Sequence, residues 1–151
     1  MVNKKKTIVI EIDDREPEME ILTMLENWNV TFERKRLNCG DYRYKNLIIE
    51  RKTMDDFCSS ILDGRLLNQT KNMLELQEQG AECFIIIIGP VSSRVANIHE
   101  NCVFGKVCSL VYKHNIRVIM CETEFQFLYC LRNLCDKHDK KEGDKDEMQK
   151  V

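Results

Sequence analysis

Two carboxylates and a lysine, Asp41, Glu50 and Lys52, are the residues of this chain best suited to catalysis. Carboxylate oxygens on rigid strands suit Mg²⁺, which takes one or two such ligands, keeps several waters and contacts a substrate phosphate. A metal ion held there polarises a phosphoryl oxygen and lowers the pKa of a bound water, while a nearby ammonium group orients that water and offsets charge. We therefore predict a site for phosphodiester hydrolysis that depends on Mg²⁺ or Mn²⁺.

The run 46–52 has to position two of these residues. Its leucine and isoleucine residues predict a strand. Side chains alternate between the two faces of a strand, so Glu50 and Lys52 share one face roughly 6–7 Å apart, and Arg51 points the other way.

Asp41 has to reach this strand from a neighbouring segment. It follows a glycine and precedes the short segment 42–44, and a turn at residues 45–46 would fold that segment back as a hairpin. The hairpin brings Asp41 beside Glu50.

More acids follow the predicted first strand, residues 7–12, which runs directly into Asp13, Asp14, Arg15 and Glu16. Strand ends are where α/β folds tend to place their sites. Asp14 could instead cap a helix, and Glu16 could be a first-turn helix acid. The Glu-x-Lys pattern also has an alternative, because alternating charge is ordinary on a half-exposed edge strand. The convergence of four acids and a lysine favours catalysis.

In these positions the chain resembles the nuclease domain of the XPF family of structure-specific endonucleases, the group that includes the archaeal Hef nucleases. The resemblance implies a restriction-endonuclease-like α/β fold, with a central mixed β-sheet flanked by helices, and a divalent ion. It also implies cleavage of branched DNA (flaps, forks, nicked junctions) in DNA repair or recombination. The matching motifs are Asp13-x-x-Glu16, Gly40-Asp41, Glu50-Arg51-Lys52-x-x-x-Asp56 and Gly64-Arg65-Leu66-x-x-Gln69, followed by the apolar run 83–88.

The resemblance implies roles for individual residues. Its catalytic residues are Asp13, Glu16, Asp41, Glu50, Arg51 and Lys52, of which Asp13, Asp41 and Glu50 are the metal ligands. Its supporting or DNA-binding residues are Arg15, Asp56, Arg65 and Gln69. Two of these have structural alternatives: Thr53-x-x-Asp56 has the form of a helix capping box, and Arg65 and Gln69 would share one helix face as a surface pair.

The chain of 151 residues is long enough for one domain with one core. We predict a basic N-terminal extension at 1–6, a nuclease domain at 7–135 and a charged, disordered tail at 136–151. We expect no tandem helix-hairpin-helix module of the kind that follows the nuclease in larger family members. Either a second chain supplies DNA contacts or this one binds weakly.

The remaining elements alternate between helix and strand, which favours an α/β fold. Periodicity and capping signals predict helices at 19–27, 65–79, 101–114 and 123–137, a helix starting after Lys52, and strands at 31–37, 83–88 and 117–121. The continuously apolar strand 83–88 should lie inside the sheet.

The net charge of −2 is an objection to a DNA partner, because phosphate neutralisation supplies much of the affinity for DNA. Basic residues nevertheless gather in the first half, around the predicted site.

Two other functions fit the sequence. The first alternative is a non-catalytic DNA-binding or scaffolding partner of another nuclease chain. The second is a restriction-like nuclease that acts on plain duplex or processes ends. The helix 123–137 carries more apolar surface than one contact with a small sheet requires, which indicates an interface. The family resemblance implies a homodimer or heterodimer through the nuclease domain. The alternative is that this helix is a simple core helix.

The eight cysteines include no Cys-x-x-Cys pair and therefore no zinc signature. No signal peptide is recognisable, and we expect reduced thiols in an intracellular protein, in the nucleus or the cytoplasm depending on its source. The longest apolar run, 84–88, is too short to cross a bilayer.

Overall fold

The computed structural model describes residues 6–17 and 20–149, which form a β-sheet with helices on both faces. The predicted extension 1–6 lies outside the described residues except for Lys6. The described strands follow the order β2-β1-β3-β4-β5-β6 in the sheet. Their bounds are β1 Ile8–Asp13, β2 Val30–Lys35, β3 Tyr42–Tyr44, β4 Leu47–Thr53, β5 Glu82–Ile88 and β6 Arg117–Cys121.

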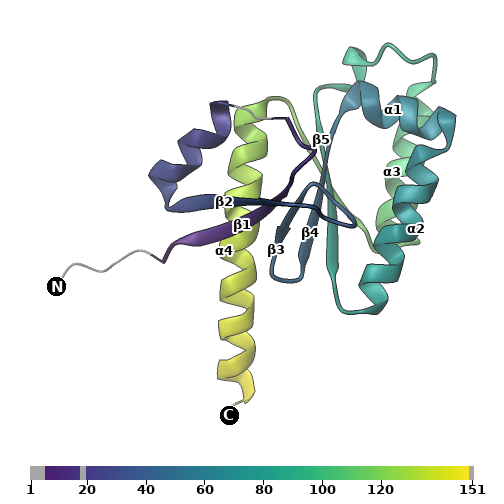
Figure 1. The fold of residues 1–151 in the computed structure, drawn as a ribbon. Helices are drawn as coiled ribbons and strands as arrows, with labels where there is room; N and C mark the ends of the chain where they lie inside the picture. The colour runs from purple at the N-terminus through teal and green to yellow at the C-terminus, as the bar shows by residue number, and fades with distance from the viewer. Residues whose placement is uncertain (1–5, 18–19, 150–151) are drawn as a thin grey trace.

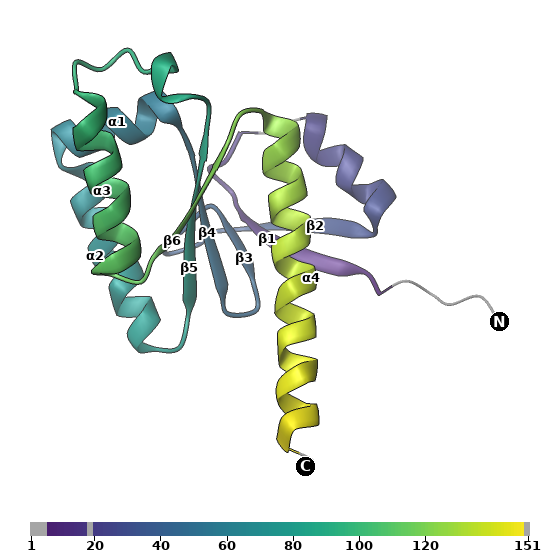
Figure 2. The ribbon, with the colours of Figure 1, turned by 180° about the vertical axis from the view of Figure 1, so that it is seen from behind.

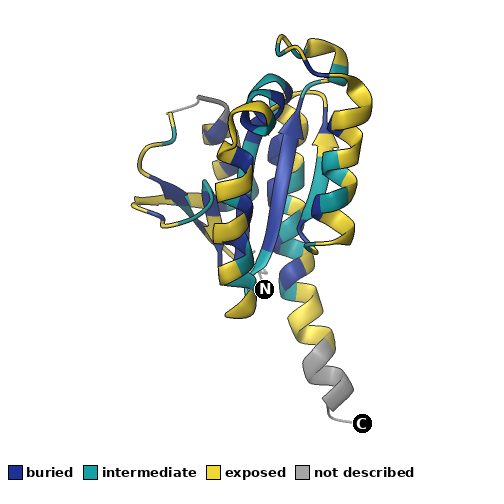
Figure 3. Ribbon diagram, turned by 90° about the vertical axis from the view of Figure 1, so that its right-hand side faces the viewer, coloured by how far each residue is buried: buried dark blue, intermediate teal, exposed yellow. Residues whose placement is uncertain are grey.

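The sheet is mixed, as predicted. β3 runs antiparallel to both of its neighbours, β1 and β4, whereas the pairs β1–β2, β4–β5 and β5–β6 are parallel. The predicted apolar strand 83–88 forms most of β5, which lies between two parallel neighbours and is buried along almost its whole length (Figure 3).

Helices cover the two faces of the sheet unequally (Figures 1 and 2). On one face lie α1, α2 and α3, and on the other lie η1, a 3₁₀-helix, and the long α4. A short turn, η2, follows β5. The bounds are η1 Glu20–Trp28, α1 Met54–Asp63, α2 Arg65–Glu78, η2 Val91–Ser93, α3 Glu100–Tyr112 and α4 Glu124–Gln149.

One half of the first face is left open. The core beneath α1, α2 and α3 contains residues of β4, β5 and β6 but none of β1, β2 or β3. On β1, Ile8, Ile10 and Ile12 are buried against the η1–α4 layer, whereas Val9 between them is 48% exposed. The faces of β1, β2 and β3 that look toward the α1–α3 side therefore border solvent next to α2.

The structure corrects two predicted elements near the N-terminus. The helix predicted at 19–27 is the 3₁₀-helix η1 over its described part, and Met19 lies outside the described residues. The strand predicted at 31–37 ends at Lys35 instead. It ends there because the backbone N–H of Leu37 leaves the sheet and donates to the side chain of Asp13 at 3.0 Å.

The disordered tail predicted at 136–151 is wrong for its described part, because α4 continues to Gln149. Charged composition alone favours disorder, but here the helix finds partners on the β3–β4 hairpin. The carboxylate of Asp139 accepts hydrogen bonds from the Tyr44 hydroxyl at 2.8 Å and the Lys45 ammonium at 2.6 Å. In the described part of the chain, no helix is long and apolar enough to cross a membrane.

Candidate active site

The predicted hairpin forms between β3 and β4, with its turn at residues 45–46. Tyr42 pairs with Ile49, so the next pair toward the open end of the hairpin is Asp41 and Glu50. The two carboxylates that the sequence separates by a turn thus meet on neighbouring strands.

A glycine lets the chain approach β4 directly before Asp41. Gly40 has a φ of 78°, and a Cβ at this position would lie 2.6 Å from Ile48 Cγ2 and 3.3 Å from the carbonyl oxygen of Ile49. No L-residue fits both this conformation and this space. The backbone N–H of Asp41 then donates to the Ile49 oxygen at 2.9 Å, which continues the ladder to the acid.

The carboxylate of Asp41 is itself held in place. The backbone N–H of Arg51 donates to Asp41 Oδ2 at 2.7 Å. The carbonyl oxygen of Asp41 accepts from the backbone N–H of Asp13 at 2.8 Å. The acid is therefore fixed to β4 on one side and to the end of β1 on the other.

Asp41 and Glu50 carry more negative charge than their surroundings neutralise. Burial, followed by the charges of Glu50 and Glu16, raises the pKa of Asp41 to about 8. Burial also raises the pKa of Glu50 to about 7; the charge of Lys52 lowers it, but Glu16 and other acids raise it further. A bound cation would relieve this excess, so the electrostatics fit a metal site.

Glu16 completes this acidic group. Its Oε2 is buried and has no hydrogen-bond partner in the described part of the chain. Its charge contributes to the raised pKa values of both Asp41 and Glu50. A buried, unpartnered carboxylate oxygen beside two other acids is a free ligand position.

Asp13 lies close by, but its oxygens are already occupied. Arg15 donates from Nε to Oδ1 and from Nη2 to Oδ2, both at 2.8 Å, and the backbone N–H of Leu37 donates to Oδ2. The hydrogen bonds from Arg15, opposed by burial, hold the pKa of Asp13 well below its usual range. Asp13 therefore holds the loop after β2 in place, and the metal-ligand role that the resemblance implies for it stays a prediction.

Lys52 is buried at the site, 2% exposed, and its Nζ lies 3.1 Å from Asp56 Oδ2. The other oxygen of Asp56 accepts from Arg65 at 3.1 Å. The backbone N–H of Asp56 donates to the side chain of Thr53, which caps α1 as the sequence predicted. Asp56 and Arg65 thus support Lys52, whereas the buried Oε1 of Gln69 lacks a hydrogen-bond partner among the described residues.

The side chain of Arg51 lies on the opposite face of β4, as strand alternation predicts, and the catalytic role implied by the resemblance stays a prediction. Its guanidinium pairs with Glu124 of α4 and lies 5.8 Å from the centre of the Phe127 ring. Its backbone N–H donates to Asp41, and, against the effect of burial, the charge of Glu16 is among those that raise the pKa of its guanidinium. Its side chain fastens α4 to the sheet.

Sequence reasoning missed two contributors. Cys39 lies near the acids: burial and the charges of Glu50 and Asp41 raise the pKa of its thiol to about 11. Leu37 holds Asp13 through its backbone. Neither carries a sequence signal, because one is an ordinary core-type thiol and the other acts through its main chain.

The described acids of the site do not place three ligand oxygens within 4.8 Å of one another. Within residues 6–17 and 20–149, the set of His and acidic side chains whose ligand atoms all lie within 4.8 Å is His138, Asp139 and Glu142 on α4. There the Lys45 ammonium already lies 2.6 Å from Asp139 and 3.6 Å from Glu142, so a cation is present. At the active site, a metal ion would have to bring the carboxylates closer together.

The fold and the acid–lysine site together define a protein of the restriction-endonuclease-like α/β class. The model of the ERCC4 domain matches residues 12–134. The chain therefore belongs to the ERCC4-domain family of XPF-type nucleases.

Solved structures agree with this assignment. XPF from Aeropyrum pernix in complex with DNA superposes with a TM-score of 0.77 and 28% identity, over 88% of this chain and 66% of that one. A second structure, XPF from the same organism, gives the same TM-score and identity over 86% of this chain and 61% of that one.

A protein of Methanocaldococcus jannaschii, named as an ATP-dependent RNA helicase, is 33% identical over 139 residues. The match covers 91% of this chain but 17% of the relative. The similarity is thus to one part of a much longer protein.

Proposed function

We propose that this chain is a Mg²⁺- or Mn²⁺-dependent endonuclease that cuts DNA near the junctions of branched substrates such as flaps, forks and nicked junctions, in DNA repair or recombination. The observation that carries the proposal is the pair Asp41 and Glu50, set opposite each other on a rigid hairpin with an excess of negative charge. The buried ammonium of Lys52 beside them supplies the third part of a hydrolytic site.

Each residue of the proposed site has a distinct role. Asp41 and Glu50 would hold the ion, and Glu16 offers the third carboxylate. The ion, when bound, supplies polarisation of the phosphoryl oxygen and a water of lowered pKa. Lys52 offsets charge at the phosphate, and Asp56 with Arg65 keeps its ammonium in place. Hydrolysis adds water across one P–O bond, leaving a phosphate monoester on one fragment and a hydroxyl on the other.

DNA as the partner is supported by the Aeropyrum pernix relative, which was solved in complex with DNA. We also propose a homodimer or heterodimer, formed through the exposed apolar side of α4. Phe125 and Tyr129 on this helix are 48% and 51% exposed, and the Tyr129 ring stacks on Trp28 at 5.3 Å. Large exposed aromatic side chains on one helix are typical of interfaces.

The test is cleavage of a labelled 3′ flap in Mn²⁺ by the wild type and by Asp41→Asn, with metal binding measured in parallel by calorimetry. The wild type should bind the ion and cut near the junction, and Asp41→Asn should do neither. The matched control is Glu78→Gln, which removes one exposed acid at the end of α2. Failure of the wild type to bind a divalent ion would instead favour a non-catalytic partner, and equal cutting of plain duplex and flap would remove the junction preference.

A further inference from the structure

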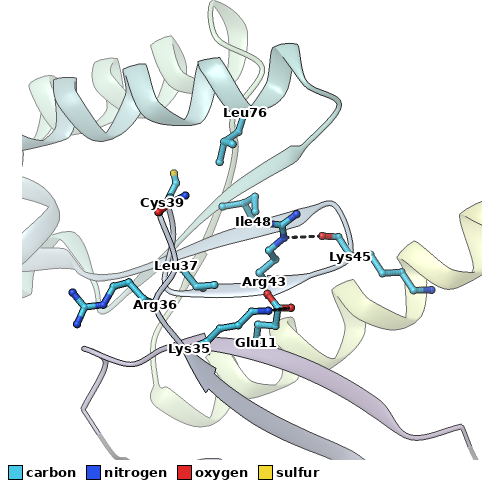
Figure 4. A pocket seen from close by; sticks show the side chains of 10 residues that line it. Glu11, Lys35, Arg36, Leu37, Cys39, Arg43, Lys45, Ile48 and Leu76 are labelled. Carbon is cyan, nitrogen blue, oxygen red and sulfur yellow. Dashed lines mark hydrogen bonds and ion pairs between the residues drawn. The ribbon is translucent and has the colours of Figure 1, made fainter.

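A pocket of about 440 Å³ lies on the open half of the sheet, between the strands and α2 (Figure 4). We call it the basic groove. Its charged lining includes Lys35, Arg36 and Arg43, and its apolar lining includes Leu37, Ile48 and Leu76. The site described above does not use these side chains.

The groove carries unneutralised positive charge. Lys35 pairs with Glu11 at 2.8 Å, and Arg36 pairs with Asp14 at 2.7 Å. Arg43 is different: its guanidinium donates to the backbone oxygen of Lys45 at 3.1 Å, and no carboxylate pairs with it within residues 6–17 and 20–149. Because Arg43 is exposed, its charge is available to an anion from solvent.

The groove is continuous with the acids. Arg43 lies two residues after Asp41 on β3, and Ile48 lies two residues before Glu50 on β4, so each shares a strand face with its acid. Cys39 lines the groove and also lies within the electrostatic reach of both acids. A chain of phosphates bound at the acids would therefore pass into the groove within about one strand repeat, roughly 6–7 Å.

We propose that the basic groove binds the nucleotide next to the scissile phosphate, with its phosphate on Arg43 and its sugar or base against the half-buried Leu76. The inference rests on the proposed function. A volume of 440 Å³ lies in the range of small-ligand pockets, about 300–1,000 Å³, and suits one nucleotide of a single strand rather than a turn of duplex. Contacts to phosphate position a strand without reading its sequence.

The test measures binding without cutting. The probe is a fluorescein-labelled single-stranded oligonucleotide, and the same strand within a 3′ flap, followed by anisotropy in EDTA at several salt concentrations. The variants are Arg43→Glu and the milder Arg43→Gln. The control is Lys71→Glu, which makes the same change in net charge at an exposed position of α2 that does not line the groove.

Arg43→Glu should weaken binding about tenfold and reduce the slope of log affinity against log salt by about 1, with Arg43→Gln intermediate and Lys71→Glu within about twofold of the wild type. Thermal melting of each variant checks that the fold is retained. Equal losses in Arg43→Glu and Lys71→Glu, or no binding by the wild type, would overturn the inference.

The binding test of the groove and the cleavage test of the proposed nuclease can fail independently of each other. A wild type that cuts flaps, alongside an Arg43→Glu variant that binds and cuts equally well, would reject the groove and leave the nuclease intact. A wild type that binds through Arg43 but cuts nothing would reject the nuclease and leave the groove as a DNA-binding site.

Discussion

The backbone N–H of Arg51 donates a hydrogen bond of 2.7 Å to the carboxylate of Asp41. A main-chain donor on β4 thereby sets the direction of the acid directly before β3, beside Glu50. The donor belongs to the backbone, so it would survive substitution of the Arg51 side chain. The orientation of the Asp41 carboxylate therefore depends on the pairing of the strands and not on the Arg51 side chain. The roles of Asp41 and Arg51 can be tested separately.

Asp41→Asn should stabilise the metal-free protein while abolishing its response to metal. Burial and repulsion from Glu50 and Glu16 make the charged carboxylate costly, so its removal should raise the free energy of unfolding by about 1 kcal/mol. Saturating Mn²⁺ should stabilise the wild type by about 2–3 kcal/mol and the variant by far less. Urea unfolding with Mn²⁺ or EDTA measures both, and an equal metal response in the two proteins would remove Asp41 from the ligands.

Lys52→Met should reduce both activity and stability. The ammonium is buried between Glu50 and Asp56, so its loss leaves uncompensated acids at a cost of about 2 kcal/mol. Flap cleavage should fall about 100-fold, because the charge beside the phosphate is lost. Single-turnover rates and chemical denaturation give the two numbers, with the exposed Lys71→Met as control. Cleavage near the wild-type rate would show that Lys52 is structural.

Arg51→Met should reduce stability while changing cleavage much less than Lys52→Met does. The Arg51 side chain contacts Glu124 and the Phe127 ring on the far face of β4, so we expect a loss of about 1–2 kcal/mol in stability and a change in cleavage of only a few fold. A double-mutant cycle with Glu124→Gln should show coupling between the two side chains. Loss of cleavage at unchanged stability would support the catalytic role that the family pattern implies.

Asp139 should make stability depend on acidic pH. Burial alone would raise the pKa of this carboxyl, but the hydrogen bonds from Lys45 and Tyr44 lower it to about 2. A lowered pKa in the folded state stabilises the fold above the unfolded value near 4, and this contribution is lost as the pH falls from about 4 to about 2.

The Asp139 side chain is partly exposed, so solvent screening reduces its contribution to stability. After allowance for solvent screening, Asp139→Asn should cost about 1 kcal/mol at pH 7, and the difference from the wild type should shrink toward pH 2. Urea midpoints of both proteins across this range measure it. A difference that stays constant down to pH 2 would mean that the Asp139 carboxylate does not titrate with the fold.

Local patterns predicted the part of the site that depends on local pairing. The hairpin, the shared face of Glu50 and Lys52 and the opposite direction of Arg51 all follow from strand alternation and a two-residue turn. The capping of α1 by Thr53 is equally local, because the partners are three residues apart. These features need no knowledge of the rest of the chain.

Sequence reasoning could not predict contacts between residues that are distant in sequence. The hydrogen bond from the backbone N–H of Leu37 to Asp13 joins residues 24 positions apart. The tail 136–151 is polar enough to be disordered until Tyr44, 95 residues from Asp139, supplies an anchor. Single-residue patterns contain neither contact.

The hairpin of β3 and β4 is fastened at both of its ends. Asp41 at its open end is hydrogen-bonded to β4, and Lys45 in its turn is ion-paired with Asp139 in the second half of α4. A force that pulled this part of α4 away from the sheet would act on the same two strands that position the Asp41 carboxylate. If that carboxylate binds the metal ion as proposed, a partner attached to α4 beyond Asp139 should change the rate of cleavage.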